Sequence, residues 1–323
     1  MSNLNEHFTS LVSVIIPAYN AERFLAETLE SVFRQSWPQI EVIVVDDGST
    51  DGTRALMGSY GSRMQAIYSP VNRGASAARN LGTCQAKGVF LQYLDADDLL
   101  RPKAIEQKVR ALNGSGADVA YSDWQKIVEG DNGAFSPGAV TARSLEDVHP
   151  DPQLALLTDF WCPPAALLYR RTLVEKIGGW NESMPLIEDA HFALDAALRG
   201  GKFVHVPGVW ADYRVQRKAV SLSQSDKSGF ARGVLTNARL AEEWWAGHEG
   251  LTPPRREALA RVYTYCAQNL FCVDEKAFHE SMERLYGVEP DFRWSWPKVA
   301  ARVVRVTGAP LARKFIRPLW AVF

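Results

Sequence analysis

The sequence predicts an α/β fold with a mostly parallel sheet, helices on both of its faces and a helical C-terminal extension. Short apolar runs, such as residues 12–16 and 40–45, alternate with segments of helical periodicity over about the first hundred residues. This alternation is typical of a parallel sheet covered by helices on both sides. After about residue 221 the apolar positions recur only at helical spacing. We therefore expect two domains, residues 1–220 and residues 221–323.

The elements of the first domain follow from these periods in order. We expect a strand at 12–16, a helix at about 21–35, a strand at 40–45, a strand near 65–68, a helix at about 75–85 and a strand at 89–94. The first helix is supported by Leu25, Leu29 and Val32, which fall on one helical face. Pro17 ends the first strand, and a turn rich in Gly and Asp follows the second. The sequence thus begins with a βαβ unit.

Polar residues follow three of the predicted strands, at 17–20, 46–47 and 95–97. Because ligands bind outside the carboxyl ends of parallel strands, we expect these segments to line one crevice. The crevice has no glycine-rich phosphate loop of the dinucleotide or P-loop type. A nucleotide bound there would be held through its base, its ribose and a metal ion on its phosphates.

Three carboxylates, Asp95, Asp97 and Asp98, crowd together behind the strand at 89–94. Like charges at such distances raise one another's pKa or recruit a cation. Mg²⁺ or Mn²⁺ is the natural candidate, since these ions typically bind one or two carboxylates together with substrate phosphates. A helix-capping role for Asp98 is the alternative.

Composition excludes several classes of protein. A net charge of -1 and a pI near 6.6 argue against a general nucleic-acid binder. The four cysteines have neither zinc-ligand spacing nor the density of a disulfide scaffold, which predicts reduced thiols. The first residues carry no apolar signal region, and no uncharged apolar stretch is long enough to span a bilayer. We therefore expect a cytoplasmic protein.

Four motifs occur in the order and spacing of a known family. They lie at 14–20 (V-I-I-P-A-Y-N), 45–51 (V-D-D-G-S-T-D), 72–80 (N-R-G-A-S-A-A-R-N) and 94–98 (L-D-A-D-D). With these motifs the chain resembles the family 2 glycosyltransferases of the GT-A fold, a nucleotide-diphospho-sugar transferase fold of Rossmann-like character. The resemblance covers about the first hundred residues.

The resemblance implies a role for each matching residue. Tyr19 would pack on the base, Asp47 would accept a hydrogen bond from its ring N–H, which suits uracil or thymine, and Asp95 would face the ribose. Asp97 would ligate the metal ion at the diphosphate. The implied nucleotide-binding set is Pro17, Tyr19, Asn20, Asp47, Arg73, Arg79, Asp95 and Ala96. Arg79 has an equal alternative, a pair with a nearby strand-end Asp.

A second segment, 177–189, resembles the part of the family that carries the catalytic base, and Asp189 matches that base. Inverting transfer needs one carboxylate to take the proton of the acceptor hydroxyl. Trp161 and Glu188 would lie on the acceptor side. The alternatives are a core role for Trp161 and, for Glu188, a place in the first turn of a helix, where acids favour the positive end of the dipole.

The chain departs from the family after the next predicted strand, where Gln216 stands at a position that is commonly His. Glutamine is a poor metal ligand and carries no charge. The resemblance therefore leaves Arg214, Arg217 and Lys218 as the candidates for contact with the diphosphate.

The C-terminal tail, residues 298–323, is basic and amphipathic, with no acidic residue after Asp291. Its cations are Lys298, Arg302, Arg305, Arg313, Lys314 and Arg317. Such a segment is typical of peripheral binding to an anionic membrane. Packing on its own domain or on a second subunit of a homo-oligomer is the alternative.

These observations predict a metal-dependent inverting glycosyltransferase of the hexosyl or N-acetylhexosaminyl type. It would move a sugar from a nucleotide diphosphate sugar, in particular a UDP-sugar, to a hydroxyl of a glycan or lipid-linked saccharide, as in cell-surface polysaccharide or lipopolysaccharide synthesis. The alternatives are a non-catalytic relative that binds nucleotide sugars or glycans, and a sugar nucleotidyltransferase.

Overall fold

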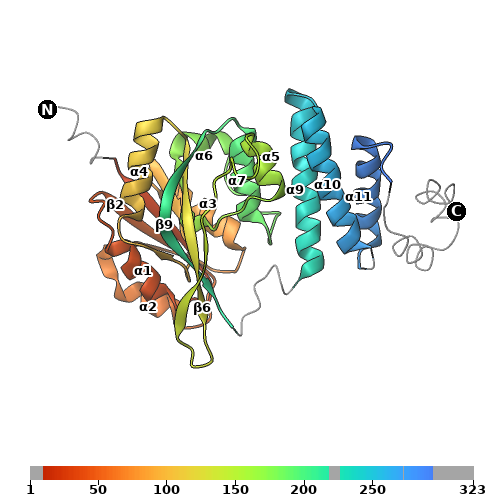
Figure 1. The fold of residues 1–323 in the computed structure, drawn as a ribbon. Coiled ribbons are helices and arrows are strands. Elements are labelled where there is room, and N and C mark those ends of the chain that lie inside the picture. The colour runs from red at the N-terminus through yellow and green to blue at the C-terminus, as the bar shows by residue number, and fades with distance from the viewer. Residues whose placement is uncertain (1–9, 218–225, 272, 294–323) are drawn as a thin grey trace. The chain divides into compact units, whose positions relative to one another are not determined.

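The computed structural model describes residues 10–217, 226–271 and 273–293 (Figure 1). Its contacts divide the chain into two compact units, Met1–Ser221 and Leu222–Phe323. The described part of the first unit is of α/β type, and that of the second is helical.

A nine-stranded sheet forms the centre of the first unit as described. Its strands are β1 (Val12–Ala18), β2 (Ile40–Asp47), β3 (Gln65–Ser69), β4 (Phe90–Tyr93), β5 (Leu99–Leu100), β6 (Val119–Glu129), β7 (Phe135–Thr141), β8 (Leu167–Arg170) and β9 (Phe203–Val215). They follow the order β3-β2-β1-β4-β8-β6-β9-β5, and β7 pairs with β6. Figure 1 shows the long strands β6 and β9 side by side.

Six of these strands run in one direction, and β5, β7 and β8 run in the other. The predicted βαβ unit is present, since β1 pairs in parallel with β2 and α1 lies between them in the chain. The predictions of an α/β fold and a mostly parallel sheet are therefore confirmed.

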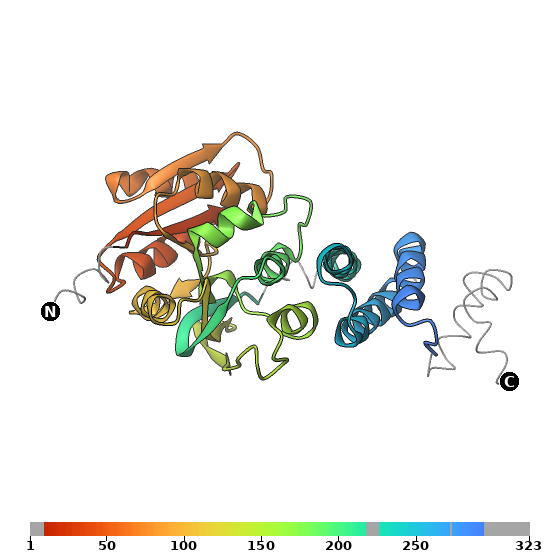
Figure 2. The ribbon, with the colours of Figure 1, turned by 90° about the horizontal axis from the view of Figure 1, so that it is seen from above.

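Helices flank the sheet on both sides, as Figure 2 shows around the strands nearest the N-terminus. The helices of the first unit are α1 (Leu25–Phe33), α2 (Thr53–Ser59), α3 (Ala75–Gln85), α4 (Ala104–Ser115), α5 (Pro152–Thr158), α6 (Arg171–Ile177) and α7 (Glu188–Leu198). Short 3-10 turns lie at Gly61–Arg63 and Pro164–Ala166. Helix α1 is shorter than expected, because residues 21–24 form turns before it.

Helix α3 packs closely on the sheet because Gly82 faces it. A Cβ atom at this position would lie 2.5 Å from the Ile15 side chain. Ala78 of the same helix joins a buried cluster with Ile43 and Val45. The close approach holds α3, and with it Arg79, against β1 and β2.

The second unit contains α9 (Lys227–His248), α10 (Pro253–Leu270) and α11 (Glu275–Val288). Trp245, Tyr263 and Leu285 are buried between these helices. The predicted helical extension is thus confirmed for the residues that the structure describes. Among these residues no helix is long and apolar enough to cross a membrane. The basic tail at 298–323 lies outside them.

Candidate active site

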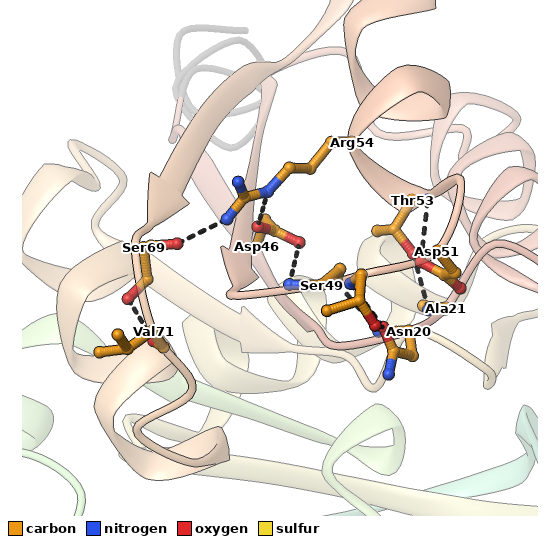
Figure 3. A network of polar contacts seen from close by, with 10 residues as sticks. Asn20, Ala21, Asp46, Ser49, Asp51, Thr53, Arg54, Ser69 and Val71 are labelled. Carbon is orange, nitrogen blue, oxygen red and sulfur yellow. Dashed lines mark hydrogen bonds and ion pairs between the residues drawn. The ribbon is translucent and has the colours of Figure 1, made fainter.

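The loop after β1 is tied to the turn after β2 by a network of hydrogen bonds (Figure 3). The Asn20 N–H donates to Ser49 Oγ (2.9 Å), and the Thr50 N–H donates to Asn20 Oδ1 (2.9 Å). Buried Asp46 accepts from Arg54 Nε (2.6 Å) and from the Ser49 N–H (3.2 Å). Through these contacts the side-chain oxygen of Asn20 and the carboxylate of Asp46 fix the two loops.

Tyr19 projects from these loops with 51% of its surface exposed. Pro17, by contrast, is a strand residue of β1 in register with Val45. An exposed aromatic ring on a fixed loop offers a flat face for stacking at little cost in conformational entropy. The geometry therefore agrees with the predicted contact between Tyr19 and a base.

Asp47 is buried, and it fixes the start of α3. Its Oδ1 accepts the Arg73 N–H (2.9 Å), and its Oδ2 accepts the N–H groups of Gly74 (2.7 Å) and Arg73 (3.1 Å). A carboxylate has about four acceptor sites, two on each oxygen, so Oδ1 retains capacity for a further donor such as a base N–H. The Arg73 side chain is exposed and pairs with Glu182 (3.0 Å).

Arg79 connects the end of β4 with the start of α7. Its buried guanidinium lies 2.6 Å from Asp95 Oδ1 and 3.1 Å from Glu188 Oε1, and it stacks over Trp180 at 4.3 Å. Burial lowers the pKa of Arg79, but the two carboxylates outweigh burial and raise it above the ordinary value. Of the two predictions for Arg79, the pair with a strand-end Asp is confirmed, and direct contact with a nucleotide stays a prediction.

Asp97 and Asp98 are an acid pair whose charge is incompletely balanced. Burial and the charge of Asp95 raise the pKa of Asp97, although Gln216 Nε2 donates to its Oδ2 (3.1 Å). Burial and the charge of Asp97 raise the pKa of Asp98 further. Asp98 Oδ1 accepts the Arg214 N–H (2.9 Å), but its buried Oδ2 has no partner. The neighbouring Ala96 is buried, and its carbonyl accepts from Thr28 (2.9 Å).

This donor set fits a divalent cation. The described residues contain no group of three or more His, Cys, Asp or Glu side chains placed to hold a metal ion by themselves. Mg²⁺ and Mn²⁺ do not need such a group, because substrate phosphates and water supply the remaining ligands. The raised pKa values and the unpaired carboxylate oxygen are the signs of a site that lacks positive charge.

Arg214 does not reach the surface as a diphosphate contact would. Its side chain is buried, where Nε donates to the Asp97 carbonyl (2.6 Å) and Nη2 pairs with Glu27 (2.9 Å). Its guanidinium lies against the rings of Phe24 and Phe135, at 4.5 and 4.6 Å from their centroids. Through the bond from Nε, Arg214 supports the main chain of the acid pair.

Of the other two predicted diphosphate contacts, Arg217 and Lys218, the structure describes only Arg217. The Arg217 side chain is exposed and pairs with Asp131, and its N–H donates to Glu129 (3.0 Å). Lys218 lies outside the described residues.

Asp189 lies in the first turn of α7. Its Oδ2 accepts Trp161 Nε1–H (2.7 Å), and its Oδ1 accepts the N–H of Ala190 (2.8 Å). Burial raises the pKa of Asp189, and the hydrogen bond from Trp161 opposes that rise. A carboxylate with a raised pKa is a stronger base than an ordinary aspartate once it is ionised, as proton abstraction from a hydroxyl requires.

Replacing Trp161 by phenylalanine is expected to move the acidic limb of the pH–kcat/KM profile to higher pH. The indole N–H stabilises the ionised form of Asp189, so its loss raises the pKa of the carboxylate, and the base becomes protonated at a higher pH. The Trp210→Phe variant is the control, because Trp210 donates to the Pro207 carbonyl. An acidic limb that stays in place or moves to lower pH in Trp161→Phe would contradict this role.

Two aromatic residues near Asp189 were not predicted from the sequence. Trp124 of β6 and Tyr213 of β9 pack edge to face on Trp161, with centroid distances of 5.4 and 5.6 Å. Trp161 is nevertheless 37% exposed, so it is not the core tryptophan of the alternative prediction. The sequence indicated these two residues only weakly as part of a site, since single aromatic residues in strands are usually core residues.

Buried Lys108 of α4 supports the segment that carries Trp161. Its Nζ donates to Gln92 Oε1 (2.6 Å) and to the Ala165 carbonyl (2.8 Å). Burial lowers the pKa of Lys108 to about 7. These contacts join α4 and β4 to the 3-10 turn that follows Trp161.

Comparisons with known proteins agree with this geometry. Residues 13–178, just over half of the chain, match the family model described as Glycosyl transferase family 2. An uncharacterized glycosyltransferase of Rickettsia typhi is 31% identical over 216 residues, which cover 66% of this chain and 64% of that protein. The chain thus spans slightly less than two thirds of that relative's length.

Two solved structures share the fold at low sequence identity. Residues 1–349 of TarS from S. aureus, in complex with UDP-GlcNAc, align with a TM-score of 0.57 at 19% identity, covering 87% of this chain and 90% of that chain. The mannosyltransferase PcManGT of Pyrobaculum calidifontis, in complex with GDP-Man and Mn²⁺, aligns with a TM-score of 0.56 at 19% identity, covering 94% and 82%. The family match, taken with this fold, shows that the chain belongs to glycosyl transferase family 2 and has a GT-A fold.

Proposed function

We propose that this glycosyltransferase is metal-dependent and inverting, and that it transfers one sugar from a UDP-sugar to a hydroxyl of a saccharide or lipid-linked saccharide. One observation carries the proposal. Asp189 follows Glu188, the first residue of α7, and Arg79 joins Glu188 to Asp95, next to the acid pair. These ion pairs would fix the start of α7, and with it the base, in relation to the acids that would hold the donor.

Donor binding is assigned to the loops after β1 and β2. Tyr19 would stack on the base, and Asp47 would accept the ring N–H of uracil, since its Oδ1 retains acceptor capacity. The similarity to TarS, which was solved with UDP-GlcNAc, supports a UDP-sugar, whereas PcManGT was solved with GDP-Man. The transferred sugar would be a hexose or an N-acetylhexosamine.

Asp97 would hold a divalent cation, Mn²⁺ or Mg²⁺, with Asp98 behind it. When bound, such an ion stabilises the negative charge that develops on the leaving diphosphate. The presence of Mn²⁺ in the PcManGT complex supports this proposal.

Asp189 would carry out the proton transfer. The acceptor oxygen attacks the anomeric carbon as the bond from this carbon to the diphosphate oxygen breaks, and the hydroxyl proton passes to the Asp189 carboxylate. Attack from the face opposite the diphosphate inverts the configuration of the anomeric carbon. A single carboxylate suffices on this side, unlike in glycoside hydrolysis, which usually needs two.

The Asp97→Asn variant should lose the metal-dependent part of donor binding. Calorimetric titration of wild type with a panel of nucleotide sugars, with and without Mn²⁺, should find tighter binding of a UDP-sugar when the metal is present. In Asp97→Asn the two titrations should agree, because a neutral amide is a poor ligand for a hard cation. Failure of every nucleotide sugar to bind wild type, with or without metal, would contradict the proposed function. Binding without any transfer would favour a non-catalytic relative.

The basic tail is proposed to hold the enzyme on an anionic membrane surface, where a lipid-linked acceptor would lie. Each cation near such a surface contributes about 1 kcal/mol. Deleting the residues after Pro297 should abolish co-flotation with vesicles that contain phosphatidylglycerol, while neutral vesicles should bind neither form. Unchanged binding to the anionic vesicles after the deletion would remove the basis for this proposal.

A further inference from the structure

A small pocket of about 40 Å³ lies next to the side chain that holds the proposed base. Its lining residues come from β6, from the end of β7 and from the segment before β8: Ser122, Trp124, Thr141, Arg143, Phe160, Trp161 and Cys162. Trp161 donates its indole N–H to Asp189 and also lines the pocket. The pocket is therefore separated from the proposed base by one indole ring.

The lining combines aromatic rings and hydroxyl groups with one charge. Trp161 is the exposed aromatic residue of the lining, Trp124 and Phe160 are buried behind it, and Ser122 and Thr141 carry hydroxyl groups. Arg143 is the single charged residue of the lining, which contains no carboxylate. Aromatic rings pack on the apolar faces of sugars, so the charge of Arg143 is the feature that would distinguish one saccharide from another.

Arg143 is exposed and little used by the protein itself. Its Nη1 donates to the Asp159 carbonyl at 3.3 Å, and it forms no ion pair within the part of the chain that the structure describes. Its charge helps to lower the pKa of Asp147, an exposed carboxylate that is bound to the Ser144 N–H and does not line the pocket. The guanidinium therefore has free donors for a ligand.

The charge of the proposed base makes this cation significant. Asp95 and Glu188 are paired with Arg79, whereas Asp189 forms no ion pair within the described residues and carries a negative charge when ionised. An anionic acceptor would be repelled by Asp189 unless a cation offset the repulsion. Arginine binds carboxylate and phosphate oxygens through paired N–H groups, which a neutral hydroxyl cannot match.

We infer that the acceptor is an anionic saccharide, with a carboxylate or phosphate group on or next to the sugar that receives the new residue, and that Arg143 binds this group. The inference rests on the proposed function and specifies its substrate class. With the reacting hydroxyl at Asp189, the anionic group would lie beyond Trp161 in the pocket. A carboxylate and a phosphate both present negatively charged oxygen atoms that Arg143 could bind.

The test is acceptor-side binding measured without donor or metal, by NMR titration with matched sugar pairs. The carboxylate arm compares methyl β-D-glucuronide with methyl β-D-glucoside, and the phosphate arm compares glucose 6-phosphate with glucose. Wild type is expected to bind at least one anionic probe roughly tenfold more tightly than its neutral counterpart. The arm with the larger preference identifies the group.

The Arg143→Gln variant should lose this preference, while Arg143→Lys should keep part of it. Arg110→Gln is the matched control, because Arg110 is an exposed arginine of α4 that pairs with Glu106. Thermal stability and UDP-sugar binding should be unchanged in Arg143→Gln. Equal binding of both members of each pair, or a preference that survives in Arg143→Gln, would overturn the inference. If the preference holds but no nucleotide sugar binds, the proposed function fails instead.

Discussion

The Asp189→Asn variant is expected to lose roughly 10²- to 10⁴-fold in kcat, the range that general-base catalysis contributes. Asparagine can accept the indole N–H of Trp161 through its side-chain oxygen, and it loses only the bond from the Ala190 N–H, so the position of the side chain should survive. It cannot take a proton from an acceptor hydroxyl. Donor affinity, measured by calorimetry with a UDP-sugar and Mn²⁺, should stay within about twofold of wild type, since the donor is assigned to other residues.

A matched control comes from the same helix. Asp195 lies further along α7, and Arg199 is its ion-pair partner at 3.4 Å. The Asp195→Asn variant makes the same chemical change away from the proposed base and should keep its kcat. Equal losses in the two variants would indicate damage to α7 instead of loss of a base. Retention of kcat in Asp189→Asn would show that another group takes the proton.

Removing Arg79 should produce the largest loss of stability in the first unit. Its side chain is 3% exposed and joins Asp95 to Glu188. In Arg79→Met these two acids would keep their negative charges in a partly buried site without a counter-charge, a change that typically costs about 3–5 kcal/mol. Urea denaturation at neutral pH measures the free energy of unfolding. The Arg73→Met control breaks the exposed pair with Glu182 and should cost about 0–1 kcal/mol.

The loss in Arg79→Met should shrink as the pH falls. Burial raises the pKa of Glu188 above its ordinary value, and Arg79 opposes that rise, so the variant should raise the pKa further. A carboxyl whose pKa is higher in the folded state than in the unfolded state destabilises the fold at high pH, where it is ionised. This destabilisation decreases as the pH falls and the carboxyl becomes protonated. A loss that is constant between pH 7 and pH 5 would contradict an electrostatic origin.

Local sequence predicts the first half of the sheet well. Strands β1, β2 and β4 are mostly apolar runs, and Pro, Gly and Asp lie at their ends or in the turns that follow, where the chain changes direction. Strand β5, by contrast, has two residues and exists through its pairing with β9, more than a hundred positions later. No local period could have indicated it, because the pairing decides the structure.

Some residues of the site could likewise be predicted from local sequence, and others could not. Tyr19, Asp47 and Asp97 follow or end strands that the sequence indicates, so it could be predicted that they lie at the same edge of the sheet. The contact between Trp161 and Asp189 joins residues that are 28 positions apart, and that between Arg214 and Asp97 joins residues 117 positions apart. Arg214 looked like a phosphate ligand by its motif. Its burial against two aromatic rings depends on packing that a motif does not encode.

The position of bound manganese tests the central claim most directly. Crystals grown with Mn²⁺ and UDP, measured near the manganese absorption edge, should show one anomalous peak within bonding distance of the Asp97 carboxylate and of the diphosphate oxygens. The uracil ring should lie against Tyr19, with its N–H directed to Asp47. UDP bound with manganese remote from Asp97, or UDP bound away from the ends of β1, β2 and β4, would contradict the account.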